Sequence, residues 1–365
     1  MSGIRTCTAE DIPAVARMFQ NAFRDPSRIA PRSLENYLRE LFLEHPWRDP
    51  ETESRVFVGA DGHVHGFIGV LPMRMSFHGR RLRAALASSL VVDNPAENPM
   101  AGARLLRSYL TGPQDLCISE TSNPTALGMW ERVGGQPVAG YSMEWLRPLK
   151  PASLGVALIA DRLRVAGILH PLASVVDAIV ARFIPALAWP APSVSNYYCS
   201  AEADDESLLE HIPSFAARYA LHPDWDPASL RWFLRHAARK DRHGQLFRRM
   251  VYSRKNEAVG CYLYYGRPRG IAWVLQIMAE PEALDAVTAD LLNHASKQGC
   301  VAVRGRTQPH LLDPLLRHRS IFFQRSSTTV HTGNDDLLAT IRSGDAFIIG
   351  LAGEGWTRLI GDNFA

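Results

Sequence analysis

The segment Asn123–Gly135, NPTALGMWERVGG, directly follows the apolar run DLCISE and has residues that could hold an extended ligand against the start of a helix. Asparagine at such a position caps a helix, and its side-chain amide can also bond amide groups of a ligand. Ala126 is small enough for a ligand to lie close to the helix. The structural alternative is a capped amphipathic helix that buries Leu127 and Trp130 in a core.

A second segment with binding chemistry is residues 90–110, LVVDNPAENPMAGARLLRSYL, where an apolar strand turns into a helix. Exposed backbone N–H groups at a helix N-terminus bind phosphate groups, helped by the helix dipole. Gly102 and Ala103 are small residues at this turn, and Arg104 and Arg107 could add positive charge. The segment is therefore a candidate phosphate-binding turn.

The first segment resembles a motif of the GNAT family of acyl-CoA N-acyltransferases. The family pattern is Asn, then a small residue, an aromatic residue and Gly, and it falls on Asn123, Ala126, Trp130 and Gly134. The resemblance implies that this strand, the helix start and the aromatic residue flank the thioester and the pantetheine arm of acyl-CoA. By motif it covers about residues 4–147.

The second segment resembles the family's pyrophosphate turn, Arg/Gln-x-x-Gly-x-Gly/Ala, and departs from it at two places. Gly102 and Ala103 match the pattern, whereas Met100 stands where the first glycine of the family would be. Acidic or neutral residues around Glu97 and Asn98 replace the leading basic residue. Backbone amides can still hold a phosphate without the glycines.

The resemblance implies acetyl-CoA or another acyl-CoA as co-substrate, and we expect no metal because no Cys/His pairing has metal-ligand spacing. It also implies that a backbone N–H on the strand around Val91 and Val92 stabilises the oxyanion. The implied cofactor-binding residues are Val91, Val92, Pro99, Met100, Ala101, Gly102, Ala103, Asn123, Ala126 and Trp130.

A GNAT enzyme needs a group that takes a proton from the incoming amine as the amine attacks the thioester. Asp93 and Glu120 lie at the ends of the two strands that splay in this family, and Glu144 lies more distantly. Glu120 is the preferred base because it ends the strand just before the Asn123 helix. The alternative is that each carboxylate only caps a turn.

The leaving thiolate often takes a proton from a second group, which in this family is a tyrosine at the position of Trp130. An indole N–H cannot supply that proton at neutral pH. Tyr141, Tyr109 or water would have to replace it, or the thiolate leaves unaided. Asp93, Glu120 and Tyr141 are thus the candidate catalytic residues.

The elements expected to position these residues follow the order β-α-α-β-β-β-α-β-α-β over the first 150 residues. Asp61-Gly62 is a strong hairpin signal within an antiparallel series, and βαβ units follow it. Residues 139–146 read as the closing strand. This order predicts a mixed sheet with helices on both faces.

The second half repeats this order of elements but not the motifs. We therefore predict an α+β protein of two tandem GNAT-like domains, each a mixed, mostly antiparallel sheet flanked by helices. Residues 1–150 would form the domain that binds acyl-CoA, and residues 151–192 an apolar helical linker. Residues 193–365 would form a degenerate copy that shapes the acceptor cleft. In that copy Glu280-Pro281-Glu282 replaces the phosphate turn and would repel pyrophosphate. The polar cluster of Arg304, Arg306, Gln308 and His310 is an acceptor surface or a solvated loop. The tail residues Asp345, Glu354 and Trp356 are not placed by the sequence.

The composition excludes several classes of function. The net charge of +3 over 365 residues and the lack of a basic run argue against a nucleic-acid partner. The N-terminus has no apolar signal core, and no uncharged run is long enough to span a membrane. The five scattered cysteines fit a reducing compartment, so we expect a cytoplasmic protein.

Three hypotheses of function follow. The first is an N-acyltransferase that moves an acyl group, most simply acetyl, from acyl-CoA to the primary amine of a small molecule. The second is a non-catalytic acyl-CoA sensor or scaffold, which the tryptophan at position 130 and the methionine at position 100 favour. The third is a long-chain or lipid N-acyltransferase with peripheral membrane contact, in which the apolar stripe from Leu172 to Leu187 covers an acyl chain. The alternative for this stripe is that it packs between the two domains. The sequence does not set the oligomeric state.

Overall fold

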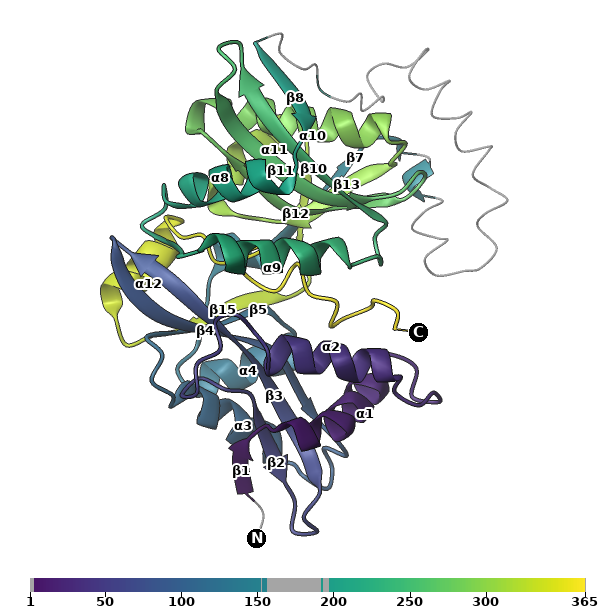
Figure 1. The fold of residues 1–365 in the computed structure, drawn as a ribbon, viewed down its shortest axis with the longest axis vertical. Coiled ribbons are helices and arrows are strands. Elements are labelled where there is room, and N and C mark those ends of the chain that lie inside the picture. Colours follow the sequence, from purple (N-terminus) through teal and green to yellow (C-terminus); the bar gives the residue numbers. More distant parts are fainter. Residues whose placement is uncertain (1–2, 152, 156–191, 193–196, 365) are drawn as a thin grey trace. The chain divides into compact units, whose positions relative to one another are not determined.

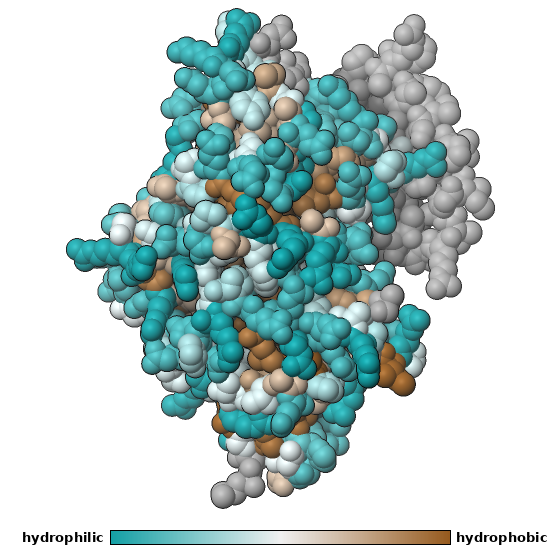
Figure 2. Space-filling model, viewed as in Figure 1, coloured by the Kyte–Doolittle hydropathy of each residue, from teal (hydrophilic) through white to brown (hydrophobic). Residues whose placement is uncertain are grey.

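The computed structural model describes residues 3–151, 153–155, 192 and 197–364. The chain forms two compact units, each built from separate stretches of sequence. The first unit comprises Met1–Ser142, Tyr219–Trp232 and Arg325–Ala365, and the second comprises Met143–Arg218 and Phe233–Gln324. The predicted helical linker at 151–192 and its apolar stripe lie almost wholly outside the described residues. The molecular face in Figure 2 is mostly hydrophilic, with small, scattered apolar patches.

The first unit is built on a mixed sheet in the order β1-β2-β3-β4-β5-β15-β6, with β9 added beside β3. Its strands are β1 (Gly3–Thr6), β2 (Arg55–Val58), β3 (Val64–Phe77), β4 (Arg80–Val92), β5 (Leu116–Ser122), β6 (Gln136–Pro137), β9 (Leu221–Pro223) and β15 (Ser327–His331). Its helices are η1 (Ala9–Asp11), α1 (Ile12–Phe23), α2 (Arg32–Phe42), α3 (Ala101–Leu110), α4 (Pro124–Arg132), α5 (Ala139–Ser142) and α12 (Asp335–Ser343).

Helices cover both faces of this sheet because successive strand residues point to opposite sides. In β3, Phe67 packs against Phe19 of α1 and Phe42 of α2, with ring centroids 6.0 and 5.2 Å away. The next residue, Ile68, belongs instead to the core cluster that contains Leu105 of α3. Thus α1 and α2 cover one face and α3 covers the other.

The second unit has a mixed sheet in the order β14-β7-β13-β12-β11-β10-β8. Its strands are β7 (Met143–Pro148), β8 (Tyr198–Glu202), β10 (Gln245–Ser253), β11 (Ala258–Gly266), β12 (Ile271–Ala279), β13 (Ala302–Arg306) and β14 (Ile321–Gln324). Its helices are α8 (Asp205–Ala216), η3 (Pro281–Ala283), α10 (Leu284–Lys297), η4 (Pro309–Leu311) and α11 (Leu312–Arg317), while α9 (Pro227–Ala238) crosses the boundary between the units.

The predicted division at residue 150 differs from this arrangement, because β9 and β15 of the first sheet and β7 of the second come from the other half of the chain (Figure 1). Residues 139–146, expected to close the first sheet, form the short helix α5 and then enter β7, which pairs with β13 and β14. Trp145 of β7 is fully buried in the core of the second unit. The first sheet is completed instead by β15, which pairs with both β5 and β6.

The same local distortion occurs in the middle of each sheet. In the first, β4 pairs in parallel with β5, and Ser88 is an extra residue in β4 opposite Gly69 and Val70 of β3. In the second, β12 pairs in parallel with β13, and Leu275 is an extra residue in β12. Each extra residue comes two positions after the last parallel pair, so the two mixed sheets repeat one architecture, as the order of elements predicted.

Candidate functional site

The most distinctive feature of the first sheet is the separation of β4 from β5. Their parallel pairing covers only Ala84–Leu86 and Leu116–Ile118. Beyond these residues β4 stays paired with β3, whereas β5 pairs with β15. The two strands therefore diverge, and we call the residues on either side, Ala87–Val92 of β4 and Ser119–Ser122 of β5, the fork.

A β-bulge lies on each strand of the fork. Ser88 is the extra residue of β4, and β5 has one extra residue between Ser119 and Ser122 relative to β15. A bulge bends its strand and leaves backbone groups out of the ladder, and bulges are frequent beside active sites. The bulges give the physical reason why β4 and β5 separate here.

The fork also contains a buried hydroxyl that needs a partner. Oγ of Ser88 is buried and has no hydrogen-bond partner among the described residues. The neighbouring Ser89 hydroxyl donates to the Ser88 carbonyl at 2.6 Å, and Ser122 donates to Ser119 at 2.8 Å. A buried polar atom without a partner is uncommon in proteins. A polar ligand in the fork would satisfy it.

The predicted phosphate turn lies directly after β4. Helix α3 begins at Ala101, and Met100, its N-cap, is 63% exposed and makes no side-chain capping bond. A Cβ added at Gly102 would have its nearest contact at 3.6 Å, on Val92. The first turn of α3 is therefore free of side-chain caps and sterically open, as a phosphate site at a helix N-terminus requires. Pro99, Ala101 and Ala103 belong to the same turn.

The predicted Asn123 motif forms helix α4 as expected, but its aromatic residue lies in the core. Oδ1 of Asn123 accepts a hydrogen bond from the Ala126 backbone N–H at 2.8 Å. Trp130 is only 2% exposed and packs edge-on against Tyr109, with ring centroids 6.0 Å apart. Of the two residues that the structural alternative buries in a core, Trp130 is buried and Leu127 is half-buried.

Glu120, the preferred base, accepts hydrogen bonds from the C-terminal segment. Its carboxylate accepts the Gly350 N–H at 3.1 Å and the Glu354 N–H at 2.6 Å, and the residue is 1% exposed. A Cβ added at Gly353 would overlap Oε2 of Glu120 and lie 2.8 Å from its Cδ. Both oxygens of the predicted base therefore accept main-chain N–H groups.

The other two candidate catalytic residues are Tyr141, whose main-chain carbonyl contacts the same Thr328 hydroxyl as the carbonyl of Glu120, and Asp93. Tyr141 is buried, its hydroxyl donates to the Ala346 carbonyl at 2.7 Å, and burial raises its pKa above the usual value. Such a hydroxyl is a structural donor rather than a ready acid. Asp93 follows β4, is partly exposed and lies 3.5 Å from Arg17.

A carboxylate that the sequence does not place, that of Glu354, contacts β5. Oε1 of Glu354 accepts a hydrogen bond from the Thr121 hydroxyl at 2.5 Å, although 233 positions separate the two residues. Trp356 and Glu354 sit on a C-terminal segment whose register depends on the Glu120 bonds. No local signal marks this segment as part of the first unit.

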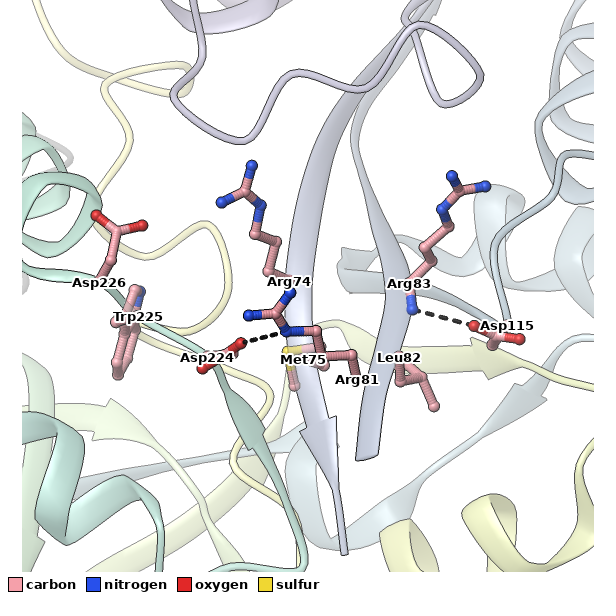
Figure 3. A pocket seen from close by; sticks show the side chains of 9 residues that line it. All are labelled: Arg74, Met75, Arg81, Leu82, Arg83, Asp115, Asp224, Trp225 and Asp226. Atoms are coloured by element: carbon pink, nitrogen blue, oxygen red, sulfur yellow. Dashed lines mark hydrogen bonds and ion pairs between the residues drawn. The ribbon is translucent and has the colours of Figure 1, made fainter. Parts of the chain in front are cut away.

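A cavity of about 650 Å³ lies at the other end of β4 (Figure 3). Its arginines are paired with carboxylates: Arg81 lies 3.6 Å from Asp224, and the Arg83 guanidinium lies 2.7 Å from Glu51. The main-chain N–H of Arg83 donates to Asp115 at 3.0 Å. Asp226 accepts the Ser229 N–H at 2.9 Å. The lining residues are Arg74, Met75, Arg81, Leu82, Arg83, Asp115, Asp224, Trp225 and Asp226. None of the predicted site residues lines this cavity.

In the second sheet, the place that corresponds to the fork is filled by side chains of the protein. Gln276 of β12 donates to Oε1 of Gln308 at 3.2 Å, and both side chains are buried. Glu280, in the predicted repelling turn, forms an ion pair with Arg218. The predicted acceptor surface also differs, because Arg304 is an ion-pair partner of Glu144 and lies 5.1 Å from the Trp273 ring.

Two kinds of feature are absent from the part of the chain that the structure describes. No group of three or more His, Cys, Asp or Glu side chains there could hold a metal ion. None of its helices combines the length and apolarity that crossing a membrane requires.

Comparisons with known proteins identify the fold. The sequence matches no protein-family model and none of the curated proteins with which it was compared. The structure resembles a probable N-acyltransferase of Enterococcus faecalis, with 12% identity, a TM-score of 0.59, and coverage of 91% of this chain and 73% of that one. It also resembles GCN5-related N-acetyltransferases of Anabaena variabilis (12% identity, TM-score 0.58, 92% and 73% of the two chains) and Kribbella flavida (13%, 0.54, 90% and 70%).

Each likeness covers at least 90% of this chain and therefore extends over both sheets. At this level of identity the likeness concerns the fold alone. The chain has the α+β fold of the GCN5-related N-acetyltransferases, with a mixed, helix-flanked sheet in each of its two units.

Proposed function

We propose that this protein transfers an acyl group, most simply acetyl, from acyl-CoA to a primary amine at the fork of its first unit. The observation that carries this proposal is the divergence of β4 and β5 at two bulges, directly before the open first turn of α3. An extended pantetheine arm would lie between the strands, and the pyrophosphate would meet the backbone N–H groups of Gly102 and Ala103, since the Ala101 N–H already donates to the Asn98 carbonyl at 3.1 Å.

The thioester oxygen would be held by backbone N–H groups of β4. The Asp93 N–H donates to the His65 carbonyl of β3 at 2.8 Å, so Asp93 faces β3. Because backbone groups alternate along a strand, Val91 also faces β3, while Val92 and Leu90 direct their N–H groups toward the fork. Of the two predicted oxyanion donors we therefore keep Val92 and add Leu90.

Only the first unit would bind acyl-CoA. In the second, the buried Gln276–Gln308 pair occupies the place where the strands diverge, and the Glu280 carboxylate stands at the turn before α10. We propose that this degenerate copy contributes to acceptor recognition. The acceptor is a small-molecule amine, and the protein acts in the cytoplasm.

The test is turnover of acetyl-CoA against a panel of primary amines, followed by thiol release, together with calorimetric titration of CoA. Gly102→Asp places a negative charge in the proposed pyrophosphate turn and is expected to weaken CoA binding by about tenfold or more. Gly102→Ala is the matched control, because its Cβ fits without a close contact and should leave the dissociation constant nearly unchanged. Equal affinities for both variants would contradict the proposed turn.

The second candidate is a non-catalytic acyl-CoA sensor. It is favoured by the buried Trp130 at the place of the family's acid and by the engagement of Glu120 with the C-terminal segment. A sensor would bind acetyl-CoA in the calorimeter but release no thiol with any amine. A protein that does not bind CoA at millimolar concentration would contradict both candidates.

A further inference from the structure

We propose that Glu354 is the group that accepts the proton of the attacking amine, and that Glu120 positions it. This inference rests on the proposed acyl transfer and names its base. The observation that best supports this inference is the hydrogen bond of 2.5 Å from the Thr121 hydroxyl to Oε1 of Glu354. Thr121 lies within the bulge of β5, three residues beyond the last residue paired with β4.

The backbone of Glu354 is fixed from several sides. Its own N–H donates to Oε2 of Glu120, and the nearby Gly350 N–H donates to Oε1 of the same carboxylate. Two residues later, the Trp356 indole donates to the Gly353 carbonyl at 2.7 Å. A turn held at both ends in this way places the Glu354 side chain in one position relative to the end of β5.

The rest of the C-terminal segment is anchored to Tyr37 of α2 and to Arg24, which directly follows α1 in the same unit. The Arg358 N–H donates to the Tyr37 hydroxyl at 2.7 Å, and Arg24 donates to the Leu359 carbonyl at 2.9 Å. The ring of Phe364 lies 5.3 Å from that of Tyr37 and 4.4 Å from the Arg358 guanidinium. These contacts hold the segment against the unit over a long stretch.

Glu354 has the chemistry that the reaction requires. Its oxygen beside Thr121 lies at the end of the fork strand, and the residue retains 8% exposure, whereas Glu120 has 1%. As the amine nitrogen bonds to the thioester carbon, its proton passes to the Glu354 carboxylate. The C–S bond then breaks with its electron pair going to sulfur, and the thiolate takes a proton from water. The Thr121 hydroxyl keeps the accepting carboxylate in place.

The experiment compares Glu354→Gln with the exposed control Glu10→Gln in the full chain, using acetyl-CoA and the best amine of the panel. We expect Glu354→Gln to lower kcat by about 10²–10⁴-fold with little change in CoA affinity. Glutamine keeps an oxygen for the Thr121 hydroxyl, so the fold should be retained. The fall in kcat/KM on the acid side of the wild-type pH profile should disappear, because no carboxylate is left to be protonated.

Two further measurements separate chemistry from structure. Sodium formate should restore part of the activity of Glu354→Ala by supplying a carboxylate, and should not act on Glu120→Ala, whose defect is one of position. If wild-type protein is active and Glu354→Gln keeps its kcat and its acid limb, Glu354 is not the base and the acyl transfer stands. If wild-type protein binds no CoA or turns over no amine, both proposals are overturned.

Discussion

Gly353→Ala is expected to lower acyl transfer by about 100-fold and the free energy of unfolding of the first unit by about 2–4 kcal/mol. The added Cβ would overlap Oε2 of Glu120 and lie 3.1 Å from Cα of Ile349. Either the buried carboxylate or the turn must move, and both changes break the bonds to Gly350 and Glu354.

The measurement is urea unfolding together with turnover of the same preparations. Gly333→Ala is the matched control in the C-terminal part of the chain, because its Cβ would meet nothing within 4 Å. The control should keep wild-type activity and change stability by less than about 1 kcal/mol. Wild-type turnover in Gly353→Ala would show that the position of the C-terminal turn does not matter for the reaction.

The second large effect is expected at Trp130. Trp130→Ala should cost about 3–5 kcal/mol of stability, since it removes a buried aromatic ring from the core formed with Tyr109, Leu105 and Cys117. A Cβ at Gly135 would lie 2.8 Å from the Trp130 ring, which shows how closely the backbone packs on it. The cavity left by alanine is therefore large.

Trp130→Phe separates packing from chemistry. Phenylalanine keeps much of the apolar volume and loses the indole N–H, so we expect folded protein with turnover within about tenfold of wild type. Denaturant titration and steady-state kinetics of both variants check this pair. A folded Trp130→Phe that has lost all turnover while still binding CoA would show that the indole takes part in catalysis.

Local signals predicted the parts of the site that depend on short stretches of sequence. Asn123 caps α4 as the motif indicated, and Gly62 adopts a positive φ of 82° in the hairpin turn predicted at Asp61-Gly62. The helix after β4 and the mixed sheets followed from the order of elements. Each of these features is decided by residues within a few positions of one another.

The exchange of strands between the sheets could not be predicted in this way. Residues 143–148 have the pattern of a strand, and that pattern does not specify its partner. The choice is made by Trp145, whose indole donates to the Arg306 carbonyl at 3.2 Å and which lies in the core of the second unit. Likewise, β15 pairs with β5 although their paired residues lie about two hundred positions apart in the chain.

The surroundings of the predicted base could not be foreseen for a related reason. Glu120 ends a strand at the expected place, and its type fits the expected role. Its carboxylate is nevertheless taken by the N–H groups of residues 350 and 354, which are more than two hundred positions away. The sequence around Glu354 carries no motif that would reveal this contact.

The central claim, one acyl-CoA site at the fork of the first unit, is tested most directly by amide hydrogen exchange with and without saturating acetyl-CoA. We expect slower exchange in peptides that contain Ser88–Asp93 and Met100–Arg104, and unchanged exchange at 274–284 in the second unit. Protection at 274–284 alone, or no protection at Ser88–Asp93 when calorimetry shows binding, would contradict the claim.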